Sequence, residues 1–229
     1  YSSPCNPTGS VYSMAELEAF AEILGKRDEI YIVSDEIYEY INYTGGHASI
    51  ASIPSVRDQT ITVNGFSKGF AMTGWRLGYI GAPKEVAKAT DKMQGQFTSG
   101  AASFSQKAAA LALDTELSET HKMKEVFQQR RDLILGLLKE IPGVKCNTPD
   151  GAFYVFPDVS SYYGKKTEDG TTIENGDQLC EYILEKAYVA LVAGSAFGAD
   201  ECIRISYAAS DKDIIESCRR LKEVLEKLK

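Results

Sequence analysis

The stretch Thr60-Ile61-Thr62-Val63-Asn64-Gly65-Phe66-Ser67-Lys68 leads from a β-branched run straight into a lysine. An earlier run of the same kind, Ile30 to Ser34, ends at Asp35. Such runs are typical of buried strands. With a third expected strand at Arg76 to Gly81 and helical segments between strands, they predict a parallel α/β sheet. Asp35 and Lys68 fall just past the carboxyl ends of two strands, where open α/β sheets place their ligands.

The glycine-rich segment Gly65 to Gly78 places Lys68 beside Ser67 and eight positions before Arg76. A lysine amine in apolar surroundings is partly desolvated, which favours the neutral form that reacts with an aldehyde. A serine hydroxyl and a guanidinium fork together suit a phosphate group. The segment therefore indicates pyridoxal phosphate. Taken alone, the segment fits a second interpretation equally well, in which Lys68 is a solvated lysine in a turn and Arg76 begins a strand.

Four motifs in order resemble those of the class I, fold-type I pyridoxal-phosphate aminotransferases. They are the lysine segment, Asn6-Pro7-Thr8-Gly9, Ser34-Asp35-Glu36-Ile37-Tyr38-Glu39 and Cys202-Ile203-Arg204-Ile205-Ser206-Tyr207. The resemblance is nearest to bacterial and plastid aspartate aminotransferases. It covers the whole chain, including Gly151-Ala152-Phe153-Tyr154 and Gly194-Ser195-Ala196-Phe197-Gly198.

The resemblance implies the C-terminal part of a cofactor-binding, parallel-sheet large domain at residues 1–120. A small C-terminal α+β domain would follow at residues 121–229. A helix expected at about 118–140 would link the two. The family carries its Asn-Pro-Thr-Gly loop near mid-sequence, whereas here the loop begins at Asn6, so the resemblance also implies that the N-terminal half is missing.

Family roles transfer to seven matching positions. Lys68 is implied as the catalytic residue that holds the cofactor and then acts as a base. Asp35 is implied as the carboxylate that keeps the ring nitrogen protonated, in place of a simple helix cap or turn acceptor. Arg204 would clamp the substrate carboxylate, in place of an exposed strand arginine. The implied cofactor-binding set is Asn6, Asp35, Tyr38, Ser67, Lys68 and Arg76, and the implied substrate-binding set is Asn6 and Arg204.

The implied reaction is transamination of L-aspartate with 2-oxoglutarate. Three alternatives stay open: a glutamate/aspartate-prephenate aminotransferase, another fold-type I enzyme such as a carbon–sulfur β-lyase, and an inactive truncated fragment. The resemblance also implies a homodimer and a role in amino-acid biosynthesis. The residue that recognises the distal side chain of the substrate cannot be placed from these motifs.

Composition and charge argue against two classes of binding partner. The 229 residues carry a net charge of -7 with a pI near 5.0, which argues against nucleic acid and anionic membranes. No apolar run is long enough to span a bilayer, and a cytoplasmic location is expected. The five cysteines have no Cys-x-x-Cys spacing, and no metal site is expected. His47 and His121 lie in polar stretches and are expected at the surface.

Overall fold

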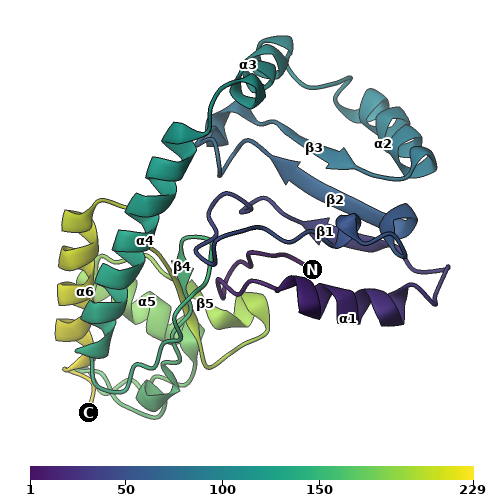
Figure 1. The fold of residues 1–229 in the computed structure, drawn as a ribbon. Helices are drawn as coiled ribbons and strands as arrows, with labels where there is room; N and C mark the ends of the chain where they lie inside the picture. The colour runs from purple at the N-terminus through teal and green to yellow at the C-terminus, as the bar shows by residue number, and fades with distance from the viewer. The chain divides into compact units, whose positions relative to one another are not determined.

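The chain forms two units in the computed structural model, which describes residues 1–229 (Figure 1). Unit 1 comprises residues 1–5, 10–124 and 150–152, and unit 2 comprises residues 6–9, 125–149 and 153–229. Each unit contains helices and a three-stranded sheet, which confirms the α/β class. The domain boundary predicted between residues 120 and 121 stays a prediction; the units described here change over between residues 124 and 125.

The sheet of unit 1 is mixed. It consists of β1 (Ile32–Asp35), β2 (Thr60–Gly65) and β3 (Gly78–Gly81), in that order. β1 and β2 are parallel, as expected, but β3 is antiparallel to β2. Residues 66–77 between β2 and β3 hold only the 3₁₀ turn η3 (Thr73–Trp75). Without a helix to carry the chain back to the starting end of β2, the next strand runs in the opposite direction.

Helix α1 (Met14–Leu24) covers one side of this sheet. Ser13 caps it in a capping box with Glu16. Leu17 and Ala21 are buried and form a core cluster with Ile32, Ile50 and Val56. Figure 1 shows α1 beside β1. The 3₁₀ helices η1 (Ile50–Ser52) and η2 (Arg57–Gln59) lie in the connection from β1 to β2.

Three helices follow β3 along the chain. They are α2 (Lys84–Phe97), α3 (Ser103–Asp114) and α4 (Ser118–Lys139), and α4 matches the helix expected at about 118–140. α2 buries no residue within the chain, and its Phe97 is 81% exposed. α4 belongs to unit 1 through residue 124 and to unit 2 from residue 125. No helix has the combination of length and apolar character needed to cross a membrane.

Unit 2 has an antiparallel sheet with strand order β4 (Tyr154–Val155), β6 (Ile203–Ser206) and β5 (Val192–Ala193). α5 (Gly176–Ala187), α6 (Asp211–Leu225) and the second part of α4 enclose its core. The 3₁₀ helices η4 (Ser160–Tyr162) and η5 (Gly194–Phe197) complete it.

The side chains of strand β6 alternate between the two faces of the sheet. Ile203 and Ile205 are buried in the core, whereas Arg204 between them is only half-buried. Because successive strand residues point to opposite faces, the guanidinium lies on the face away from that core.

Candidate active site

Asp35 lies at the carboxyl end of β1, where hydrogen bonds fix its backbone. Its N–H donates to the Tyr1 carbonyl at 2.9 Å, and its own carbonyl accepts from the Ser3 N–H at 3.1 Å. The side-chain Oδ1 accepts from the Ile37 N–H at 3.1 Å, in the local turn typical of aspartate. A half-buried carboxylate is therefore held in one place at the end of the strand.

Lys68 and Tyr38 lie at the same edge of the sheet. Lys68 is half-buried and follows the end of β2 by three residues. Its Nζ lies 6.0 Å from the ring centroid of Tyr38, whose side chain is 3% exposed. Since β1 and β2 are parallel, their carboxyl ends bring Asp35 and the lysine loop to one edge.

Ser67 and Arg76 belong to the loop that joins β2 to β3. The Phe66 N–H donates to the Leu77 carbonyl at 3.3 Å, which closes the base of the loop. Arg76 adopts a left-handed backbone conformation with φ 51° and is exposed. One of its guanidinium nitrogens, Nη1, donates to the Thr73 carbonyl at 2.7 Å.

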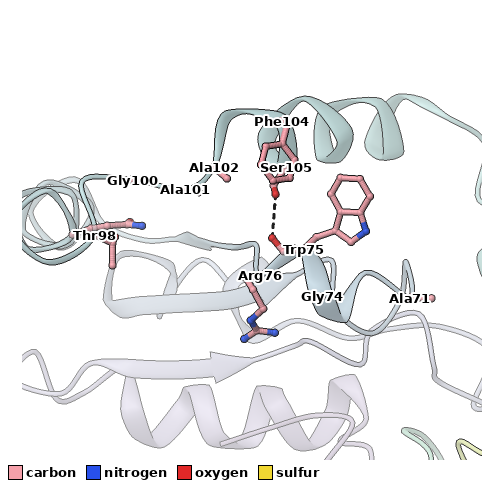
Figure 2. A pocket seen from close by; sticks show the side chains of 11 residues that line it. Ala71, Gly74, Trp75, Arg76, Thr98, Gly100, Ala101, Ala102, Phe104 and Ser105 are labelled. Carbon is pink, nitrogen blue, oxygen red and sulfur yellow. Dashed lines mark hydrogen bonds between the residues drawn. The ribbon is translucent and has the colours of Figure 1, made fainter.

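A cavity of about 720 Å³ borders this loop. Figure 2 shows Trp75, Arg76, Thr98 and Ser105 among its lining residues. The Ser105 hydroxyl on α3 donates to the Trp75 carbonyl at 3.1 Å, so the arginine turn is held against the start of α3. In the same view the Arg76 guanidinium points away from α3.

Next to Asp35, Glu36 is 4% exposed and forms a charged network. Its carboxylate accepts from Ser34 Oγ at 2.8 Å and from Ser49 Oγ at 2.7 Å, and it contacts His47 Nε2 at 2.8 Å. Burial alone would raise the pKa of Glu36, but these hydrogen bonds outweigh burial and hold the pKa below its ordinary value. The surface position expected for His47 is wrong, because its side chain is only 16% exposed.

For two neighbouring groups the effect of burial prevails, so their net pKa shifts are opposite to that of Glu36. The pKa of Glu39 is raised by burial, and that of Tyr40 is raised to about 12 by burial and by the Glu39 charge. Donor atoms of Glu36, Glu39 and His47 lie within 4.8 Å of one another, a grouping that could accept a cation. The absence of a metal site stays a prediction.

In unit 2, Arg204 and Asn6 are brought together across 198 positions of sequence. Arg204 Nη1 donates to Asn6 Oδ1 at 2.8 Å. The guanidinium carbon also lies 4.7 Å from the ring centroid of Tyr154 and 5.1 Å from that of Phe197. A guanidinium that contacts only neutral groups and donates one hydrogen bond to them keeps its remaining N–H donors for a carboxylate.

The roles of Tyr154 and Phe197 are not apparent from the sequence. Both residues lie in segments that carry the family resemblance, but neither has a charge or spacing that signals contact with an arginine. Their only sequence signal is that each lies in a glycine-containing motif, Gly151-Ala152-Phe153-Tyr154 or Gly194-Ser195-Ala196-Phe197-Gly198.

The donor set of unit 1 fits pyridoxal phosphate. Lys68 offers an amine for the cofactor aldehyde, and Asp35 offers a fixed carboxylate for the ring nitrogen. Ser67 and Arg76 offer a hydroxyl and a guanidinium for the phosphate. Asn6 and Arg204 belong to unit 2, and their geometry suits a substrate carboxylate. The seven role assignments stay predictions.

Comparison with known proteins points to one family. Residues 1–221 match the model of aminotransferase class I and II. The chain is 52% identical over 233 residues to the bifunctional aspartate aminotransferase and glutamate/aspartate-prephenate aminotransferase of Petunia hybrida, covering 99% of this chain and 48% of that protein. It is 54% identical to the aspartate aminotransferase of Pinus pinaster, covering 91% of this chain and 43% of that one.

Solved structures of aminotransferases also match this chain. The aspartate aminotransferase of Rhizobium meliloti matches with a TM-score of 0.95 and 40% identity, over 100% of this chain and 57% of that one. The aromatic aminotransferase of Pyrococcus horikoshii matches with a TM-score of 0.89 and 39% identity, over 98% and 58% of the two chains. The chain therefore spans about half the length of the relatives it matches.

Proposed function

Because this chain belongs to the aminotransferase class I and II family, we propose that it serves the pyridoxal-phosphate-dependent transamination of L-aspartate with 2-oxoglutarate. The observation that carries the proposal is the half-buried Lys68 amine at the carboxyl edge of a parallel strand pair, the edge at which the fixed Asp35 carboxylate also lies. The names of the relatives support aspartate as the substrate. The homodimer, the biosynthetic role and the cytoplasmic location stay predictions.

Each residue has a chemical task in this proposal. Pyridoxal phosphate, when bound, supplies an electron sink for charge that develops at the substrate Cα. Asp35 holds the proton on the ring nitrogen, and Tyr38 and Asn6 offer donors to the phenolic oxygen. Arg204 binds the α-carboxylate and so orients the Cα–H bond.

Lys68 then takes the proton from the substrate Cα through its Nζ and returns it during product formation. Ser67 and Arg76 bind the phosphate and so keep the cofactor in register with the lysine.

The first test is the visible absorption of the purified chain with added pyridoxal phosphate, before and after borohydride reduction. We expect a reducible band that is lost in Lys68→Ala. A band that persists in Lys68→Ala would remove this lysine from its role. Asp35→Ala should still bind the cofactor, but turnover should fall by orders of magnitude, and near-normal turnover would reject the ring-nitrogen role.

The reaction itself is tested by product analysis with aspartate and 2-oxoglutarate. We expect oxaloacetate and glutamate in equal amounts; release of ammonia in their place would indicate a lyase. Arg204→Lys should raise the Michaelis constants for the amino acid and the keto acid together, because lysine cannot make the bidentate contact. Unchanged constants would place the carboxylate clamp elsewhere.

Prephenate is a second candidate amino acceptor. The observation that favours it is the bifunctional name of the Petunia hybrida relative, together with the aspartate/prephenate name of the Cereibacter sphaeroides relative, which is 41% identical to this chain. Transamination rates measured side by side with prephenate and with 2-oxoglutarate as the amino acceptor distinguish the two possibilities. A rate with prephenate no higher than the rate without acceptor would reject this candidate.

A further inference from the structure

Three neutral groups contact the Arg204 guanidinium. Asn6 Oδ1 accepts one N–H at 2.8 Å. The ring centroids of Tyr154 and Phe197 lie 4.7 and 5.1 Å from the guanidinium carbon, both within the range of cation–π contact. No carboxylate is paired with Arg204 among the salt bridges of the chain. The guanidinium is thus surrounded by neutral groups.

Both rings are held by the fold and not by the arginine. Tyr154 lies on β4 opposite Ser206 of β6 and is 7% exposed. Phe197 ends the η5 turn, and its ring meets that of Phe156 edge to face, with centroids 5.8 Å apart and an interplanar angle of 87°. Two aromatic rings held by the fold therefore converge on the Arg204 side chain.

We propose that Tyr154 and Phe197 are positioning residues that hold the Arg204 guanidinium in the orientation that receives a carboxylate. This inference rests on the proposed function, because it assigns Arg204 to the carboxylate that amino acids and keto acids share. An arginine free in solvent loses rotamer freedom when it clamps a ligand. Here folding has already restricted it, and the apolar rings reduce solvent screening of the ion pair that forms.

The competing explanation is that the rings only fill space in unit 2. Tyr182 on α5 provides a control of the same residue type and similar burial in the same unit, because it is 8% exposed against 7% for Tyr154 and is not one of the groups that contact Arg204. Tyr182→Leu removes a buried ring from the same unit without touching the arginine. A merely structural role for Tyr154 would give the two leucine variants the same phenotype.

The experiment uses the 229-residue chain with acetate, L-aspartate and 2-oxoglutarate as carboxylate probes. Tyr154→Leu and Phe197→Leu remove the rings, whereas Tyr154→Phe and Phe197→Tyr keep an aromatic face. The first readout is the NMR signal of the Arg204 Nε–H, assigned by its loss in Arg204→Lys. The second is the dissociation constant of each probe by calorimetry.

We expect ring currents to displace the wild-type Nε–H signal, and the leucine variants to move it towards that of a free arginine. Dissociation constants should rise about three- to tenfold in each leucine variant and about twofold or less in the aromatic variants. Tyr182→Leu should lower stability without changing either readout.

The outcomes separate the two proposals. If carboxylates bind through Arg204 but the leucine variants match wild type or Tyr182→Leu, the positioning role is overturned. Wild-type binding that does not depend on Arg204 also overturns it. If acetate binding depends on the rings while aspartate and 2-oxoglutarate are not transaminated, the positioning role stands and the proposed reaction fails.

Discussion

Replacing Glu36 with glutamine tests the charged network beside Asp35. The change keeps the shape of the side chain but removes the charge that Ser34, Ser49 and His47 contact at 2.7 to 2.8 Å. Hydrogen bonds to a charged group contribute about 1.5–3 kcal/mol each, and an amide can retain part of this set. We therefore expect Glu36→Gln to lower the free energy of unfolding of unit 1 by about 3 kcal/mol at neutral pH.

The pH dependence makes the prediction specific. The folded pKa of Glu36 lies below its ordinary value of 4.5, so its charge stabilises the fold above that pH. This contribution is lost as the pH falls through the folded pKa. The difference between wild type and Glu36→Gln should therefore shrink at low pH.

Glu39→Gln is the matched control, because burial raises the pKa of Glu39, whereas the pKa of Glu36 is lowered. The charge of Glu39 therefore has the opposite effect on the free energy of unfolding. Its charged form opposes folding, so the protonated carboxyl favours stability at low pH and that benefit is lost as the pH rises through the folded pKa. Glu39→Gln should be neutral or stabilising at neutral pH.

The assay is urea unfolding followed by the fluorescence of Trp75, the one tryptophan of the chain, which lies in unit 1. Wild type and the two variants are compared at neutral pH and near pH 4. A loss in Glu36→Gln that is equal at both pH values would refute the role of the charge. Equal destabilisation by Glu36→Gln and Glu39→Gln would refute the assigned directions of the two pKa shifts.

Four further substitutions test helix capping and packing. Ser13→Ala removes the N-cap of α1 and should cost about 1 kcal/mol in the same assay, and no loss would show that the cap is dispensable. Gly69→Ala would place a Cβ 2.5 Å from a ring carbon of Tyr40 and should cost about 1–3 kcal/mol. Gly74→Ala in the same loop meets nothing within 4 Å and should be milder; the reverse order in urea unfolding would contradict this geometry. Leu138→Ala, at a site 1% exposed, should cost unit 2 about 2–5 kcal/mol by circular dichroism, whereas a loss below about 1 kcal/mol would mean that the cavity collapses.

Local elements were predictable because their signals lie within a few residues of one another. The capping residue Ser13 and the apolar spacing behind it specify the start and the buried face of α1. The β-branched runs specify β1 and β2. Asp35 ends β1 and Lys68 follows the end of β2, so both lie at the carboxyl edge of a parallel pair. Six of the seven predicted site positions lie in such segments or directly beside them, and Asn6 lies in a turn motif.

Tertiary structure alone decided the long-range relations. The direction of β3 depends on the path of residues 66–77, and the pairing of His47 with Glu36 depends on how the loop after β1 folds back. Asn6 reaches Arg204 across 198 positions, and two rings from separate segments converge on the same guanidinium. Residue type sets what a side chain can bind, but strand register and loop closure set its neighbours, because these depend on the free energy of packing the whole unit.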